Sequence, residues 1–123
     1  MESIVTLIAA ETDMMRMSVT GAFSLDDVFE ALESLRTRLS DEPRSAVLLD
    51  GRGVTGEILE TDRFLLGAKI AELFGGQIKF VLLLEEAYIT KLDEITANNR
   101  GARLLVTHLE DEALEFLAPS MSA

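Results

Sequence analysis

The chain has 123 residues, 48% of them hydrophobic and 27% charged, a balance typical of a folded globular protein rather than a disordered one. Its 22 acidic and 11 basic residues give a formal net charge of −11, which disfavours nucleic acid and anionic membranes as partners. The sequence contains no cysteine, which excludes disulfides and thiolate zinc sites.

The hydropathy of the chain shows no membrane segment. No apolar run approaches the roughly 20 residues that span a bilayer, and residues 1–10 lack the basic start of a secretory signal. We therefore expect a cytoplasmic protein without membrane insertion. At this length we expect a single domain over residues 1–123.

The chain begins with the pattern of a β-hairpin. An apolar run over residues 4–11 leads into a turn at residues 11–13, and apolar and polar side chains then alternate from Met15 to Val19. This alternation is typical of a strand with one wet face.

A helix is predicted next. Ser24 precedes an apolar stripe at helical spacing, and Asp27 three positions later forms a capping-box-like start. Residues 41–43 end the helix. The stripe consists of Leu25, Val28, Phe29, Leu32, Leu35 and Leu39.

The segment from Ser45 to Phe74 carries the candidate site. Ala46–Leu49 has no polar alternation, as expected for a central strand covered on both faces. Asp50 and a glycine-rich loop follow, and a helix begins near Thr61. Ligands and partners of open α/β sheets gather where strand carboxyl ends meet helix amino ends. The helix is expected to bury Phe64, Leu65, Ala68, Ala71 and Phe74 and to end at Gly75-Gly76.

The last third of the chain repeats the strand and helix pattern. Its expected elements are a strand at Ile78–Leu84, a helix with Tyr88, Leu92 and Ile95 on one face, a stop at Asn98–Gly101, a strand at Arg103–Thr107 and a short helix containing Ala113, Leu114 and Leu117. The resulting order, ββαβαβαβα, predicts an α/β fold. Its sheet is mostly parallel, with an antiparallel N-terminal hairpin and helices on its faces.

Two segments resemble a known family. The strand, aspartate and loop at Val47–Thr55 resemble the STAS domain of sulfate transporters and anti-sigma factor antagonists. The ending, Asn99–Arg103 followed by a strand and Asp111–Leu117, is similar to the SpoIIAA-like subgroup. The resemblance covers nearly the whole chain. It implies a SpoIIAA/STAS-like fold and a small non-catalytic module for regulation or protein interaction.

The resemblance also implies a place for regulation. In anti-sigma antagonists of the family, a partner kinase phosphorylates a serine or threonine at the start of the helix after the central strand. The matching stretch here, Glu57–Glu60, holds no hydroxyl, so the phospho-switch residue is absent. Thr61 is the nearest substitute, although capping of the helix explains both Thr61 and Asp62.

The candidate binding or regulatory residues are Asp50, Arg52, Thr55, Glu57, Glu60, Thr61, Asp62 and Tyr88. Arg52 is expected to pair with Asp50 or to contact an anionic ligand. Tyr88 is expected to be half in the core, with its hydroxyl available to a cleft.

The sequence also allows functions other than binding a protein partner. The main alternative is a carrier of a small apolar or lipid-like ligand in a cleft beside the sheet. The acidic residues near Thr61 leave a hard-cation site as a lesser alternative. An enzyme would need Asp50, Glu57 and His108 to converge, and His108 is better explained as a surface residue. We therefore predict no catalytic residue, no cofactor and no metal.

Self-association is also expected. The hairpin offers an edge strand, and Met14, Met15 and Met17 form an adaptable apolar cluster. This pattern favours a homodimer. The acidic surface would suit a basic protein partner, whose identity the sequence does not reveal.

Overall fold

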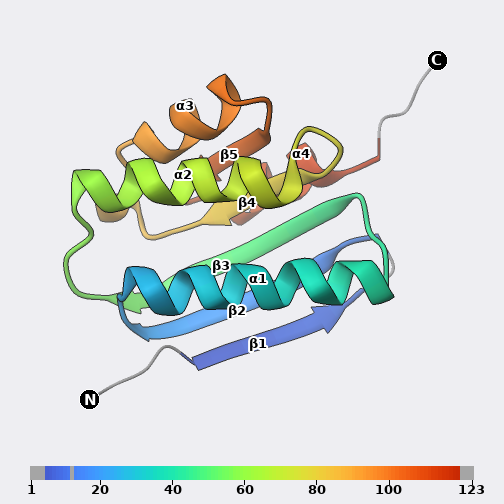
Figure 1. Cartoon of the computed structure of the whole chain (residues 1–123), viewed down its shortest axis with the longest axis horizontal. Helices are drawn as coiled ribbons and strands as arrows, with labels where there is room; N and C mark the ends of the chain where they lie inside the picture. Colours follow the sequence, from blue (N-terminus) through green and yellow to red (C-terminus); the bar gives the residue numbers. More distant parts are fainter. Residues whose placement is uncertain (1–4, 12, 120–123) are drawn as a thin grey trace.

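The computed structural model describes residues 5–11 and 13–119, which form one five-stranded sheet with its strands in chain order (Figure 1). Strands β1 and β2 are antiparallel, and the other neighbours are parallel. This arrangement confirms the predicted α/β class and element order. The elements are β1 (Val5–Ala10), β2 (Met15–Ala22), α1 (Leu25–Asp41), β3 (Ala46–Thr55), α2 (Glu60–Phe74), β4 (Lys79–Leu83), the 3₁₀ turn η1 (Glu86–Tyr88), α3 (Leu92–Asn99), β5 (Arg103–Thr107) and α4 (Glu110–Leu117).

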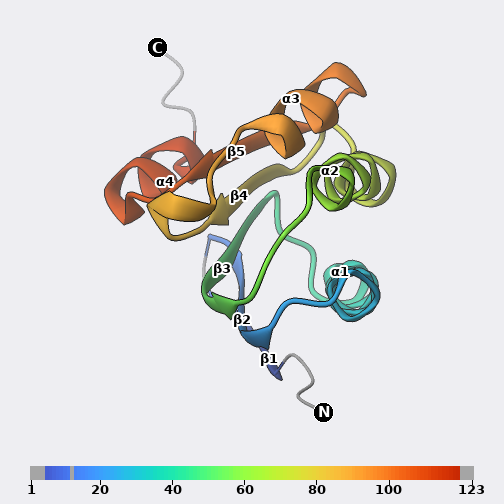
Figure 2. The ribbon, with the colours of Figure 1, turned by 90° about the vertical axis from the view of Figure 1, so that its left-hand side faces the viewer.

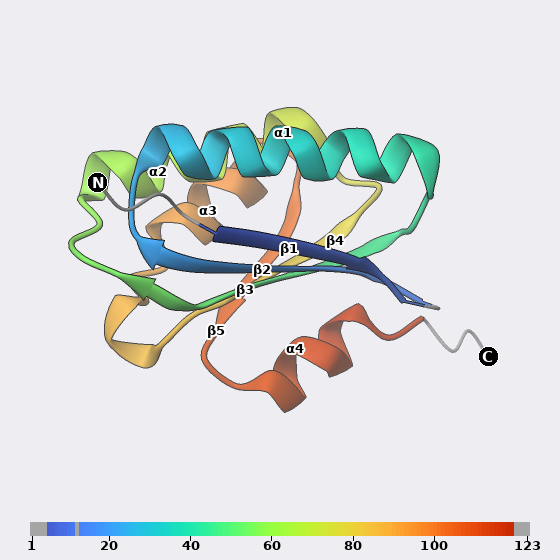
Figure 3. The same cartoon turned by 90° about the horizontal axis from the view of Figure 1, so that it is seen from below.

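The helices divide unequally between the two faces of the sheet. Helices α1, α2 and α3 cover one face and α4 covers the other (Figures 2 and 3). Each parallel strand is added beside the previous one, and right-handed crossovers then put all three connecting helices on the same side. Helix α4 follows the last strand, so no crossover constrains it, and it packs against β3, β4 and β5.

Strand β3 contributes to the core on both of its faces, as predicted for a central strand. Val47 and Leu49 join the larger core beneath α1, α2 and α3. Ala46 and Leu48 join a smaller core beneath α4. The continuous apolar run is therefore explained by burial on both sides.

The predicted loop after Asp50 is wrong, because β3 continues to Thr55. The added residues pair with the end of β2, where Gly53 lies beside Thr20 and Thr55 beside Ala22. A Cβ on Gly53 would lie 2.6 Å from the Thr20 Cγ2 atom. Glycine here permits close strand pairing rather than a turn. Between Asp50 and Gly53, β3 carries one residue more than β2, which is a β-bulge.

The predicted buried face of α2 is also wrong at Phe64 and Leu65, whereas Phe74 is buried and Ala71 packs against the larger core. Phe64 and Leu65 are 42% and 43% exposed, and Ala68 and Ala71 are only partly buried. The face that packs inward consists of Arg63, Leu66, Gly67, Ile70 and Phe74. The inward face includes an arginine and a glycine, so apolar spacing alone selected the wrong side of the helix.

The start of α1 and the end of α2 lie where the sequence predicts them, but Tyr88 lies on a different element. Ser24 caps α1 by accepting a hydrogen bond from the Asp27 N–H at 3.4 Å. Gly75 ends α2 with a φ of 61°, as expected of glycine. Tyr88, however, lies on η1 rather than on α3, which begins only at Leu92.

The N-terminal hairpin is present, but its methionines do not form a surface cluster. Met15 and Met17 are fully buried in the larger core, and Met14 packs against the smaller one. Met15 and Met17 face inward because alternate residues of β2 point toward α1. Of the predicted first strand and turn, Ile4 and Thr12 lie outside the described residues.

Candidate functional site

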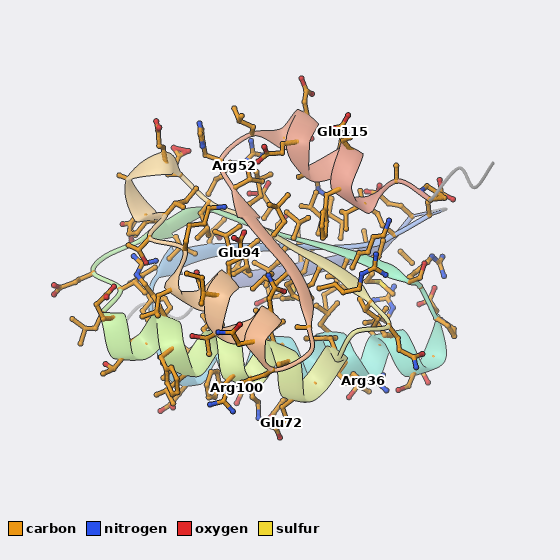
Figure 4. All side chains as sticks on the ribbon, turned by 90° about the horizontal axis from the view of Figure 1, so that it is seen from above. Arg36, Arg52, Glu72, Glu94, Arg100 and Glu115 are labelled. Carbon is orange, nitrogen blue, oxygen red and sulfur yellow. The ribbon has the colours of Figure 1, made fainter. Side chains whose placement is uncertain are left out.

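The eight predicted site residues fall into two groups. Asp50 and Arg52 lie on β3 and pair with each other. Asp50 also makes an ion pair with Arg16 on β2, and Arg52 makes one with Glu110 at the start of α4. Figure 4 shows Arg52 on the same side of the molecule as Glu115 of α4. The other six lie between Thr55 and the first turn of α2, or on η1: Thr55, Glu57, Glu60, Thr61, Asp62 and Tyr88.

The first group forms a cluster of two arginines and two carboxylates. The Arg52 guanidinium donates to both Asp50 oxygens, at 3.0 Å from Nε and 2.8 Å from Nη2. The same Nη2 lies 3.3 Å from a Glu110 oxygen. Arg16 reaches Asp50 at 3.6 Å and Glu110 at 3.8 Å. The predicted Arg52–Asp50 pair is confirmed, and its two-point geometry is the strong form of this interaction.

The charges within this cluster balance one another. The hydrogen bond from the Arg52 side chain is the largest influence on Asp50 and holds the pKa of that carboxyl below its usual value. The same bond raises the pKa of Arg52. Two positive and two negative side chains leave no net charge for an anionic ligand. The cluster therefore joins β2, β3 and α4 as a structural contact. Spacing in the sequence did not identify Arg16 and Glu110, because they are far from Asp50 along the chain.

The start of α2 forms the second group. The helix begins at Glu60 with Leu59 as its N-cap, so the predicted N-cap role of Thr61 is wrong. Asp62 instead satisfies this helix end, since its Oδ2 accepts a hydrogen bond from the Leu59 N–H at 3.1 Å. The side chains of Glu57, Glu60 and Thr61 are exposed.

Tyr88 anchors the segment that enters α2. Its hydroxyl donates to the carbonyl oxygen of Gly56 at 2.8 Å. Gly56 has a φ of 92°, a conformation that favours glycine. The partly buried ring of Tyr88 packs against the larger core. This contact places η1 beside the segment that follows β3, at one edge of the sheet.

Sequence patterns did not predict the apolar surface beside these residues. Leu59 is exposed at the N-cap of α2, Phe64 and Leu65 are exposed on the helix itself, and Ile95 is exposed on α3. The Arg100 guanidinium lies 5.5 Å from the centre of the Phe64 ring, which joins the outer surfaces of α2 and α3. We call Leu59, Phe64 and Leu65, together with the exposed acidic residue Glu60, the α2 surface.

A narrow apolar cavity lies beneath this end of α2. Its volume is about 40 Å³. Its polar side chains include Arg63 and Asp93, both buried. Arg63 donates to the Tyr88 carbonyl oxygen at 2.5 Å, whereas the Asp93 Oδ2 atom is buried without a hydrogen-bond partner among the described residues. Burial is the main cause that raises the pKa of Asp93.

The three side chains of the candidate catalytic site are not joined to one another among the described residues. No hydrogen bond or ion pair connects Asp50 with Glu57 or His108 within residues 5–11 and 13–119, and His108 is exposed. The same residues contain no group of three histidine or acidic side chains placed to hold a metal ion. None of the described helices is long and apolar enough to cross a membrane.

The fold is similar to that of solved proteins. An anti-sigma factor antagonist from Mycobacterium paratuberculosis matches with a TM-score of 0.62 at 20% sequence identity, over 94% of each chain. An uncharacterized protein of the DUF3478 family from Shewanella loihica PV-4, with a SpoIIAA-like fold, matches with a TM-score of 0.58 at 16% identity, also over 94% of each chain. No family model and no curated protein matches the chain. The comparisons establish a SpoIIAA-like fold, as the resemblance implied.

Proposed function

We propose, on the premise of a SpoIIAA-like fold, that this chain is a non-catalytic regulatory module that binds a protein partner through the α2 surface. The observation that carries the proposal is the outward position of Phe64 and Leu65. Large apolar side chains side by side on an exposed helix are typical of a surface that another protein covers.

The charges around these side chains indicate the kind of partner. Glu57 and Glu60 are exposed beside Leu59, and the whole chain carries a net charge of −11. A partner surface with apolar side chains surrounded by lysine or arginine would be complementary in both respects. A phosphate on Thr61 would meet these carboxylates, so regulation through that hydroxyl is not part of the proposal.

The carrier alternative has less support. The cavity beneath α2 measures about 40 Å³, whereas an engineered apolar cavity that binds benzene has about 150 Å³. A lipid-like molecule would therefore need a cavity of much larger volume. Mass spectrometry of gently purified protein would reveal such a ligand, and a bound hydrophobic molecule recovered at a fixed ratio would favour the carrier over the binding module.

The test compares matched variants on two helices. Phe64→Asp alters the α2 surface, and Leu114→Asp is its control on α4, where Leu114 is 41% exposed. Glu60→Lys and the control Glu115→Lys test the charge in the same way. Tagged proteins would be used to capture partners from the native host, with quantitative mass spectrometry as the readout.

We expect a specific protein that the wild type and both α4 variants retain. Phe64→Asp should weaken its capture by about tenfold or more, as expected when a central apolar contact is lost, and Glu60→Lys should weaken it less. Equal capture by all five proteins, or losses confined to the α4 variants, would overturn the assignment to α2.

A further inference from the structure

The two edge strands of the sheet, β1 and β5, differ in whether side chains bond their outward backbone groups. At β5, side chains of α3 and of its N-cap residue form hydrogen bonds with the backbone groups that point away from β4. The Asn98 amide donates to the Leu104 carbonyl oxygen at 2.9 Å and accepts from the Leu104 N–H at 2.8 Å. Two positions along, a Glu94 oxygen accepts from the Val106 N–H at 2.7 Å, and the Lys91 amine donates to the Val106 carbonyl oxygen. These side chains occupy the places that a sixth strand would take.

The outer edge of β1 has no comparable cover from the rest of the described chain. The pair Glu11–Met14 shows which residues of β1 form hydrogen bonds with β2, because the Glu11 N–H donates to the Met14 carbonyl oxygen at 2.8 Å. Bonded and non-bonded pairs alternate in an antiparallel ladder, and the same register continues along the hairpin. The backbone groups of Leu7 and Ala9 therefore face β2, while those of Thr6, Ile8 and Ala10 point outward.

Strand β1 is suited to contact with a second acidic chain. Its sequence, VTLIAA, carries no charge in a protein whose net charge is −11, so two copies could meet here with little repulsion. Leu7 is 72% exposed, the largest value among the exposed large hydrophobic residues of the described chain. Ile8 packs against the larger core, and alternation directs Leu7 to the opposite face, where α4 packs on β3, β4 and β5.

We propose that two copies of this chain pair β1 with β1 in antiparallel fashion, making one continuous sheet with Leu7 opposite its counterpart. Residues opposite each other in such a pair have side chains on the same face of the sheet. The two-fold axis must therefore pass beside a residue that lies opposite its own copy, and not between two residues. Centring on Leu7 places Thr6 opposite Ile8, and both have outward backbone groups. Those residues exchange hydrogen bonds across the two-fold axis, and the two Leu7 side chains cover each other.

The protected β5 edge limits the assembly to two copies. Each copy has one open edge in the part of the chain that the structure describes, so the isologous contact closes on itself and does not propagate. The pairing also leaves α2 free, because β1 lies at one edge of the sheet and α1 lies between β1 and α2 (Figure 2). The dimer is therefore independent of the proposed partner surface.

The absence of cysteine permits a direct test by cross-linking. In the proposed register Leu7 forms a non-bonded pair, with Cα atoms about 4.5 Å apart, within the range of about 4.4–6.8 Å that a disulfide requires. Leu7→Cys should therefore give a covalent dimer on mild oxidation, seen on a non-reducing gel. Leu109→Cys, at an exposed site just before α4 where the leucine is 50% exposed, should give no covalent dimer.

Sedimentation velocity over a concentration series tests the unmodified chain. Wild type should show a monomer–dimer equilibrium. Leu7→Lys should raise the dimer dissociation constant by about tenfold or more, because like charges would stand opposite each other. Leu109→Lys should leave it unchanged. A wild type that is monomeric throughout, a dissociation constant unaffected by Leu7→Lys, or equal cross-linking of both cysteine variants would overturn the proposal.

Discussion

Gly67 on α2 lies so close to Asp93 on α3 that a Cβ atom at Gly67 would collide with the Asp93 carbonyl oxygen. The same Cβ would lie 3.1 Å from the Thr96 Cβ and 3.2 Å from the Ala97 nitrogen. Backbone and side chain of α3 thus occupy the space that any larger residue would need. The close approach explains why a glycine is tolerated inside α2.

Gly67→Ala should therefore destabilise the fold, although alanine in a helix is ordinarily favoured over glycine by about 1 kcal/mol. We expect a loss of about 1–3 kcal/mol in the free energy of unfolding, because the two helices must move apart. Urea unfolding followed by circular dichroism measures it. Glu72→Ala, on an exposed position of the same helix, is the control and should change little. A more stable Gly67→Ala protein would contradict the close contact.

Asn98→Ala should weaken the attachment of α3 to the edge of β5. The substitution removes both hydrogen bonds to Leu104, so we expect a loss of about 1–2 kcal/mol in the free energy of unfolding. Hydrogen exchange should become faster at the Leu104 amide. Asn99→Ala is the matched control, since the neighbouring side chain makes no bond to β5 within the described residues. If Asn98→Ala and Asn99→Ala had the same stability and the same exchange rate at Leu104, Asn98 would not hold α3 to the edge of β5.

Asp93 should make the fold less stable as the pH rises. Burial raises its pKa in the folded state, so the folded protein binds this proton more tightly than the unfolded chain does. The associated stability is full below the usual aspartate pKa of about 4 and is lost as the pH rises through the raised pKa. Arg63 opposes this shift but does not cancel it.

Asp93→Asn should remove that part of the pH dependence and match or exceed wild-type stability at pH 7. Urea unfolding at several pH values measures the difference. Asp111→Asn, on the exposed surface of α4, is the control. If wild type and Asp93→Asn had parallel stability profiles, the carboxyl of Asp93 would not titrate as its burial requires.

Asp50 should show the opposite dependence. The Arg52 guanidinium lowers its pKa in the folded state, so its contribution is present above the usual aspartate pKa and is lost as the pH falls through the lowered value. Asp50→Asn should cost about 1 kcal/mol at pH 7, a modest value because the pair is partly exposed. The difference from wild type should shrink in acid. A cost that stays constant with pH would rule out the ion pair as its cause.

Periodicity predicted the elements well because each strand and helix has a local hydropathy pattern. It failed where a contact between distant residues decided the outcome. Gly53 looked like part of a loop. In the structure it continues β3, because it pairs with Thr20 on β2, whose side chain leaves room only for glycine. Phe64 and Leu65 looked buried, but α3 packs against the side of α2 that carries Gly67. The single domain and the cytoplasmic location stay predictions.

The sequence alone determined the α/β class, the order of the elements and the central place of β3, and it offered the pairing of Asp50 with Arg52 as one of two alternatives. These follow from local spacing, since burial on one or both faces leaves a repeating pattern along the chain. Only the tertiary structure decided which face of α2 is exposed, where Arg16 and Glu110 meet Asp50, and which sheet edge is covered. Such features depend on packing between segments far apart in the chain, and that packing leaves no periodic signal in either segment.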